Sequence, residues 1–316
     1  MGKKILWLLV GCLVFICACG KEEQTVPGEE KNDTQMLNEK EEYNIKEYGG
    51  AVNGTGTYYY TGEETVIKYE YMAKGTGQLS VGIMLLCDGI ALPFHTSEDK
   101  TNAIIQIIPL ENGKQKEIDL CFVPYGKKGE IASLEIVDIL NMDYDVTKGE
   151  KEDILSDFIH GLPYEIGYLT DINVNLNADG AVCEEKIYEK YSKEKIENYV
   201  SGDEEESLLE AEGTVNDEVS KWYTVEPGQP LDICIRYKGN VPEGIVTSLY
   251  VDGVLYSAFE GKGYAKCPVE AGVYTDIVGM IDTSGFDKGR HMVFSVCGNV
   301  KYNNVVPVTS FVFEVQ

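Results

Sequence analysis

The sequence has little positive charge, and this argues against two classes of partner. Its 316 residues contain 27 Lys and Arg against 53 Asp and Glu, which gives a formal net charge of −26 at pH 7. Proteins that bind nucleic acids need a basic surface for the phosphates, and proteins that lie on anionic lipid need a basic surface for the headgroups. We therefore expect no nucleic-acid partner and no body that lies flat on an anionic membrane.

Motifs for catalysis and metal binding are also missing. The sequence has no H-E-x-x-H, C-x-x-C or G-x-S-x-G pattern, and no glycine-rich phosphate loop precedes a helical segment. The three histidines, His95, His160 and His291, lie in dissimilar contexts. We expect His160 to cap the end of a helix and His291 to be a structural residue of a strand. The sequence thus predicts no enzyme, no metal site and no cofactor.

No apolar run reaches the roughly 20 residues that a transmembrane helix needs. The longest is at the N-terminus, where Lys3 and Lys4 precede an apolar run of 14 residues, 5–18, that ends before the charged residues 21–23. A short basic start, an apolar run and an abrupt polar end are typical of a signal peptide.

The end of this run resembles the lipobox of bacterial lipoproteins. Ile16, Cys17 and Ala18 place an aliphatic residue at −3 and a small residue at −1 ahead of Cys19. The resemblance implies that Cys19 is acylated and becomes the N-terminus of the mature chain, and two acyl chains suffice for stable anchoring. We expect a signal peptide over residues 1–18 and a lipid-anchored protein on the extracytoplasmic side of the cell membrane.

A charged segment with few apolar residues follows the anchor. Residues 20–47 contain eight Glu, one Asp and four Lys, without periodicity. Such a composition does not bury enough apolar surface to offset the entropy of ordering. The sequence therefore predicts a flexible acidic stalk over residues 19–47.

Three stretches of the remaining chain recur in the same order. Residues 60–71 (YTGEETVIKYEY) match 223–237 (YTVEPGQPLDICIRY), residues 85–94 (LLCDGIALPF) match 249–259 (LYVDGVLYSAF), and residues 128–136 (KGEIASLEI) match 288–296 (KGRHMVFSV). Two copies of one domain explain this order most economically. We place the first copy at residues 48–183 and the second at 213–316.

Both copies carry the pattern of short strands. Residues 231–237 alternate strictly between apolar and polar, which indicates a strand with one buried face. Asp88-Gly89 and Asp252-Gly253 separate apolar runs, as in tight hairpins. We predict a mostly β fold with two tandem immunoglobulin-like or fibronectin-like β-sandwich domains. There is no Cys…Trp…Cys pattern to support true antibody-domain homology.

Two segments depart from the strand pattern. Apolar residues at 154, 155, 158 and 159 share a helical face, which predicts a small helical insertion near 138–163. Residues 166–176 then alternate as the closing strand of the first domain. The charged connector, residues 184–212, has apolar residues spaced for a short amphipathic helix, and a plain spacer is the alternative.

The pairing of the cysteines stays open. An exported chain often forms disulfides, but three cysteines in each copy cannot all pair within their domains. Cys234 lies on the polar side of its strand, which argues against a core disulfide with Cys297. The six cysteines after Cys19 are Cys87, Cys121, Cys183, Cys234, Cys267 and Cys297.

One stretch resembles part of a calcium loop. Asn175, Asn177, Asp179 and Gly180 match its first positions, but Lys186 stands where the bidentate Glu belongs. We therefore expect a polar turn here and no bound metal.

Aromatic residues give the best indication of a binding surface. Tyr58, Tyr59 and Tyr60 are consecutive, so a strand places at least one of them on the exposed side. Exposed tyrosines suit contacts with protein or sugar, whereas the alternative is that these residues were selected for β propensity.

Together these features predict a lipid-anchored cell-surface protein that acts as a binding or adhesion module for a protein or glycan ligand. An accessory or structural subunit of a membrane or envelope complex is the alternative, and an enzyme with an unrecognised site in the 138–163 insertion is the third possibility. Exposed aromatic residues on a sheet face favour the binder, and an extended apolar patch favours the subunit.

Overall fold

The computed structural model describes residues 50–51, 57–72, 79–140, 142, 159–169, 187–197, 209–299 and 306–316. These residues are mostly strand, and a short 3-10 helix occupies Thr283–Gly285. No helix in this part of the chain has the length and apolar character needed to cross a membrane. The expected signal peptide, stalk and calcium-like turn lie outside the described residues.

The first half of the chain forms two sheets that enclose a core. Along β3, Ile67, Tyr69 and Tyr71 are buried, whereas Val66 and Lys68 are exposed, as expected for a strand with one buried face. Sheet A has the order β1 (Gly50–Ala51), β3 (Thr65–Met72), β8 (Gln115–Phe122) and β6 (Phe94–Thr96). Sheet B has the order β2 (Thr57–Tyr60), β10 (Ile159–Tyr168), β9 (Ile131–Leu140), β4 (Leu79–Cys87) and β5 (Ile90–Leu92), with β7 (Ile105–Leu110) beside β4.

The second half also forms two sheets around a core. Leu231, Ile233, Ile235 and Tyr237 of β15 are buried in it, as the alternation predicts. Sheet C has the order β11 (Ile187–Tyr188), β18 (Tyr264–Val269), β16 (Val241–Val251), β20 (Gly289–Asn299), β21 (Val306–Val315) and β14 (Trp222–Val225), with β17 (Val254–Tyr256) beside β16. Sheet D has the order β12 (Ser192–Lys195), β19 (Val273–Ile281), β15 (Leu231–Lys238) and β13 (Glu210–Val215).

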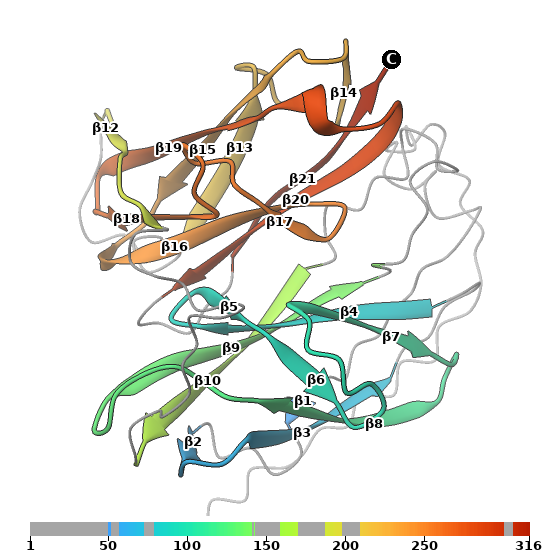
Figure 1. Ribbon diagram of the computed structural model, residues 1–316. Coiled ribbons are helices and arrows are strands. Elements are labelled where there is room, and N and C mark those ends of the chain that lie inside the picture. Colours follow the sequence, from blue (N-terminus) through green and yellow to red (C-terminus); the bar gives the residue numbers. More distant parts are fainter. Residues whose placement is uncertain are drawn as a thin grey trace, which may run out of the picture.

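The sequence repeat corresponds to a repeat of strand pairing (Figure 1). β2 runs parallel to β10, and β14 runs parallel to β21. β4 pairs with β5, β7 and β9, as β16 pairs with β17, β18 and β20. The hairpins at Asp88-Gly89 and Asp252-Gly253 have φ values of 49° and 77°, and of 49° and 78°, so the turn prediction is confirmed.

The predicted helical insertion is wrong where the structure describes it. Residues 159–163 belong to β10, which pairs antiparallel with β9 and places His160 opposite Asp138. His160 therefore does not cap a helix. The strand that contains Ile166 begins earlier than predicted, at Ile159, and residues 143–158 and 170–176 lie outside the described part of the chain. Pairing with β9 over nine registered positions outweighs the local helical spacing.

The connector is not helical in its described residues. Ile187–Tyr188 forms β11 against β18, and Ser192–Lys195 forms β12 against β19. Both short strands add to edges of the second half, because backbone groups at a sheet edge accept a further strand readily. Long-range pairing again decides the conformation of a segment whose apolar spacing favoured a helix.

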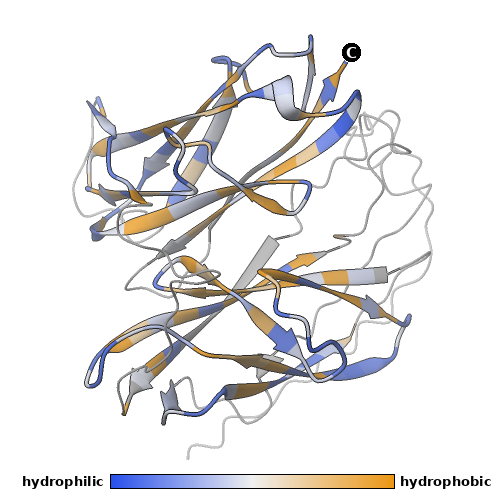
Figure 2. Cartoon of the chain, in the orientation of Figure 1, coloured by the Kyte–Doolittle hydropathy of each residue, from blue (hydrophilic) through white to orange (hydrophobic). Residues whose placement is uncertain are grey.

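The outer faces of sheets B and C pack against each other. Figure 1 shows β4, β5 and β9 facing β16, β17 and β20, and Figure 2 shows apolar and polar positions interleaved along these strands. Tyr250 and Phe294 stack with ring centroids 5.0 Å apart. The two halves are therefore joined by a buried apolar cluster, which consists of Met84, Leu86, Ala91, Val137, Ile139, Met142, Tyr250, Phe294 and Val296.

Candidate functional site

The three consecutive tyrosines belong to β2, an edge strand of sheet B. Tyr60 is buried and Tyr58 is half-buried against the core of the first half, whereas Tyr59 is 61% exposed. Successive side chains of a strand point to opposite faces. Tyr59 therefore lies on the outer face of sheet B, and the prediction of an exposed tyrosine is confirmed.

Strand register places Tyr59 among other exposed apolar side chains. Tyr59 is opposite Gly167 on β10, and Gly167 is opposite Ile131 on β9. Leu169 follows Gly167 by two positions, and its amide donates to the carbonyl of Tyr60 at 3.0 Å, which continues the ladder. Ile131 is 69% exposed and Leu169 is 56% exposed. We call Tyr59, Ile131 and Leu169 the Tyr59 row.

Gly167 allows the ring of Tyr59 to lie across the sheet. A Cβ atom at position 167 would be 3.2 Å from both Cδ1 and Cε1 of Tyr59. Gly167 itself is buried, although it faces outward between two exposed side chains. The ring thus covers the glycine backbone and presents its remaining surface to solvent, which suits an aromatic contact with a ligand.

A polar row borders the Tyr59 row. Thr57 donates a hydrogen bond from its hydroxyl to Oε2 of Glu165 at 3.2 Å. Thr57 lies two positions before Tyr59, and Glu165 lies two positions before Gly167. Ser133 is opposite Glu165 on β9, and its amide donates to Oδ1 of Asp88 at 2.9 Å. Burial raises the pKa of Asp88, while the hydrogen bonds from Ser133 act in the opposite direction.

The outer face of sheet B changes from exposed to buried along β9. Ile131 is exposed, whereas Ser133, Glu135, Val137 and Ile139 on the same face are buried. Val137 and Ile139 belong to the cluster between the two halves. The Tyr59 row is therefore the end of this face that the second half of the chain leaves uncovered.

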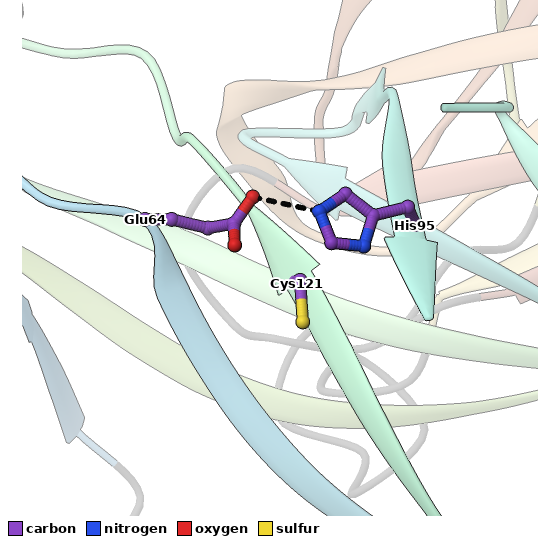
Figure 3. Close-up of side chains that lie close together, drawn as sticks. All are labelled: Glu64, His95 and Cys121. Carbon is purple, nitrogen blue, oxygen red and sulfur yellow. Dashed lines mark hydrogen bonds and ion pairs between the residues drawn. The ribbon is translucent and has the colours of Figure 1, made fainter. Parts of the chain in front are cut away.

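A second group of reactive side chains lies on the outer face of sheet A. On β8, Cys121 is paired with His95 of β6 on one side and with Val66 of β3 on the other. Glu64 precedes Val66 by two positions and reaches the same face (Figure 3). Nε2 of His95 lies 2.9 Å from Oε1 of Glu64. One donor atom from each of Glu64, His95 and Cys121 lies within 4.8 Å of the others.

Sequence reasoning missed the group formed by Glu64, His95 and Cys121. Its members are separated by 31 residues or by 26 residues, so they match no local motif. The alternation along β8 places Cys121 on the same face as Asp119, which identifies the polar side of the strand. Only the register of β3, β8 and β6 shows that the three side chains meet.

His291 is held between two acceptors on β20. Its Nδ1 lies 2.7 Å from Oδ2 of Asp252, and its Nε2 lies 2.9 Å from the carbonyl oxygen of Asp287. The imidazole also stacks on Phe313, with centroids 5.0 Å apart. These contacts fix the ring against the strand and its hairpin, in keeping with a structural role.

The described cysteines are thiols. Cys267 on β18 is opposite Ile245 of β16, and Cys297 on β20 is opposite Thr247 of β16, so their Cα atoms are farther apart than two strand spacings, or about 9.6 Å. A disulfide needs Cα atoms closer than about 7 Å. Burial raises the pKa of Cys267 to about 12. The free thiols are Cys87, Cys121, Cys234, Cys267 and Cys297, and Cys183 lies outside the described residues.

No family model matches the chain, and no curated protein matches it. One solved structure that is similar is the CsuC–CsuE chaperone–tip adhesion subunit pre-assembly complex from archaic chaperone-usher Csu pili of Acinetobacter baumannii. It has 9% identity, covers 82% of this chain and 95% of that chain, and gives a TM-score of 0.22.

A second similar structure is a protein from Corynebacterium diphtheriae whose name describes it as membrane anchored. It has 7% identity, covers 85% of this chain and 58% of that chain, and gives a TM-score of 0.24. Both TM-scores are below 0.5, so neither likeness carries an argument about fold or function.

Proposed function

We propose that the chain is a lipid-anchored protein of the bacterial cell surface that binds a protein ligand through the Tyr59 row. Residues 1–18 act as the signal peptide, acylated Cys19 holds the mature chain to the membrane, and residues 19–47 act as a stalk. Two tandem immunoglobulin-like domains then present the binding face. A negative net charge of −26 keeps such a body away from the anionic membrane to which it is tethered.

The exposed Tyr59 row is the observation that supports binding. Three large apolar side chains, all more than half exposed, are neighbours on the outer face of one sheet. Contiguous apolar surface with a polar border is typical of an interaction site. The ring of Tyr59 rests on Gly167 and so loses little rotamer freedom when a ligand covers it.

The composition of the row favours a protein ligand. Ile131 and Leu169 add aliphatic area on both sides of the Tyr59–Gly167 contact, and this area matches apolar side chains of a partner. Glu165 and Asp88 are acidic neighbours, so a ligand with a basic rim fits best. A glycan would stack on the Tyr59 ring alone and is the other outcome of the test.

The alternative role as an accessory subunit calls for an extended apolar patch. Most apolar side chains on the outer face of sheet B are already buried against the second half of the chain. Three of the exposed apolar side chains on this face form the Tyr59 row, and Ile107 of β7 is separated from β9 by β4. This arrangement favours a compact ligand contact over a broad docking face.

Binding can be tested with purified full-length protein in detergent, presented to a random peptide library and to a printed glycan array. We expect enrichment of peptides that have an apolar centre and basic flanks. Tyr59→Ser removes most of the exposed aromatic area and should lower binding by at least about tenfold, because central aromatic residues of an interface typically contribute 1.4 kcal/mol or more.

The matched control is Tyr191→Ser, which removes another exposed tyrosine far along the chain. This variant should bind the selected peptides as well as the wild type does. Equal losses in the two variants, or retention in Tyr59→Ser, would show that the Tyr59 row is not the site. If the protein binds a glycan selectively and Tyr59→Ser abolishes this binding, the ligand of the Tyr59 row is a sugar and not a protein.

The lipid anchor has a test of its own. Cys19→Ser should leave the protein unprocessed and unlabelled when cells are grown with a radioactive fatty acid. Cys17→Ser is the control, because position −2 is removed with the signal peptide and should still allow labelling. Fatty-acid labelling of Cys19→Ser at the wild-type level would contradict lipidation at this cysteine.

A further inference from the structure

We propose that Glu64, His95 and Cys121 form a Zn²⁺ site on the outer face of sheet A. The site is separate from the Tyr59 row, which lies on the outer face of sheet B. It does not depend on the proposed ligand binding.

Three structural elements bring the three side chains together. Cys121 stands on β8 between β3 and the edge strand β6, directly opposite His95. Glu64 immediately precedes β3 and lies two positions before Val66, which is paired with Cys121. Because neighbouring strands are about 4.8 Å apart and side chains alternate, all three groups project to one side of the sheet, with Glu64 two residues along the chain from the level of Cys121 and His95.

The hydrogen bond at Nδ1 fixes the tautomer of His95. Nδ1 lies 3.1 Å from the carbonyl oxygen of Thr96, and a carbonyl oxygen only accepts, so Nδ1 carries a proton. Nε2 of His95 faces the carboxylate of Glu64, with 2.9 Å between Nε2 and Oε1. Two lone pairs at this distance need a cation between them, either a second proton on Nε2 or a metal ion.

A backbone hydrogen bond at the other ring nitrogen is the usual support of a histidine that binds metal. His95 already has this support from Thr96. The ring is also mostly shielded, with 15% of its side chain exposed. Its Nε2 is therefore oriented before any ion arrives.

The donor set favours Zn²⁺ over the common hard cations. Thiolate, imidazole and carboxylate are the ligands of Zn²⁺ sites, whereas Ca²⁺ and Mg²⁺ take oxygen ligands. Cys121 is buried although it lies on the outer face of its sheet. On binding, the thiol bond to hydrogen breaks, the Sγ–Zn bond forms, and the proton leaves to solvent.

The spacing of the donor atoms fits one ion after small adjustments. Metal–ligand bonds of about 2.0–2.3 Å place tetrahedral ligand atoms roughly 3.3–3.7 Å apart. The Nε2–Oε1 distance of 2.9 Å has to open slightly, and the other donor atoms, within 4.8 Å, have to close by about 1 Å. Glu64 is exposed and free to move, and a water molecule would complete the fourth position.

The test uses metal-free full-length protein in detergent, titrated with Co²⁺ as a spectroscopic substitute and then with Zn²⁺ in competition with a chromophoric chelator. We expect one equivalent per chain and a thiolate-to-cobalt charge-transfer band. Cys121→Ser should abolish the band. The affinity for Zn²⁺ should fall by more than the roughly 10- to 100-fold that loss of an outer-shell partner causes.

Glu64→Gln is the second variant, because Glu64 is exposed and its replacement leaves the core intact. It should keep the charge-transfer band and lower the affinity for Zn²⁺. Cys234→Ser removes a half-buried thiol on sheet D and should change neither quantity. An unchanged band in Cys121→Ser, or no Zn²⁺ binding by the wild type, would overturn the proposal.

Discussion

At the scale of single residues, Gly298 determines how closely the two halves of the chain approach. A Cβ atom at position 298 would lie 2.5 Å from Cα of Gly89 and 2.8 Å from Oε2 of Glu135. The first of these atoms belongs to the backbone of a tight hairpin, which has little freedom to move. Only glycine fits at this position of β20, where the strand meets the hairpin of the other half.

We expect Gly298→Ala to reduce the free energy of unfolding by about 1–3 kcal/mol, the usual cost of overpacking a buried site. Gly285→Ala is the matched control, since an added Cβ there meets no atom within 4 Å. It should change stability by less than about 0.5 kcal/mol. Urea unfolding measures both variants, and an equal effect in the two would show that the contact does not constrain the fold.

Asp88 gives a prediction for the pH dependence of stability. Its pKa is raised by burial above the ordinary value of 3.8. A carboxyl group with a raised pKa stabilises the fold when protonated, so its contribution is present below pH 3.8 and is lost as the pH rises through the raised value. Asp88→Asn should therefore gain stability relative to the wild type over this rise in pH.

Asp99→Asn supplies the opposite case for comparison. Hydrogen bonds from Thr101 lower the pKa of Asp99, so its contribution is present above pH 3.8 and is lost as the pH falls. The stability difference between Asp99→Asn and the wild type should change with pH in the direction opposite to that of Asp88→Asn. Urea midpoints measured across this range would contradict at least one assignment if the two stability differences changed in the same direction with pH.

At the scale of secondary-structure elements, sheet C keeps its cysteines inside the core. Cys267 on β18 and Cys297 on β20 are buried, whereas Cys234 on β15 faces outward and is half-buried. Burial also raises the pKa of Cys267 to about 12. A thiol that is both inaccessible and neutral reacts slowly with electrophiles.

Iodoacetamide at pH 8 should therefore label Cys234 much faster than Cys267 or Cys297 in the native protein. In urea the three cysteines should react at similar rates. Peptide mass spectrometry after timed quenching reads each site separately. Native labelling of Cys267 as fast as that of Cys234 would contradict the placement of β18 in the core.

Much of the fold follows from the sequence, because strand alternation and hairpin turns are local signals. Ile233, Ile235 and Tyr237 are buried as their spacing predicts, and Asp88-Gly89 forms the expected turn. The predicted end of a helix at Ile159 and His160 is wrong, because pairing between β9 and β10 is a long-range contact that local spacing does not encode. The stretch from Ile187 to Lys195 contains two strands for the same reason.

The candidate sites also contain residues that local sequence predicts and residues that only strand register brings together. Tyr59 was predictable, because three consecutive tyrosines on a strand place at least one outside. Its neighbours Ile131 and Leu169 were not, since they meet Tyr59 only through the parallel pairing of β2 with β10. Glu64, His95 and Cys121 also depend on register, in this case across β3, β8 and β6.

At the scale of the whole molecule, the two halves are coupled by the apolar cluster between sheets B and C. Phe294 is central to this contact, because it is buried and stacks on Tyr250 beside Val137 and Ile139. Burying this cluster stabilises both halves only while they stay together. The chain should therefore unfold in a single calorimetric transition.

We expect Phe294→Ala to lower the free energy of unfolding by about 3–5 kcal/mol. The two halves should then unfold in two separate transitions. Val254→Ala on β17 is the control, since Val254 is an exposed side chain of the same sheet. Its effect should be within about 0.5 kcal/mol. A single transition in Phe294→Ala would mean that other contacts couple the halves.

Binding of a protein by the Tyr59 row is tested most simply by site-specific photo-crosslinking on intact cells, followed by mass spectrometry. A photo-reactive side chain replaces Ile131 in the Tyr59 row, or Val278 on the outer face of sheet D as the control, since both positions are exposed. We expect a defined protein adduct from position 131 and none from position 278. The same adducts from both positions, or none from position 131, would contradict a protein-binding role for the Tyr59 row.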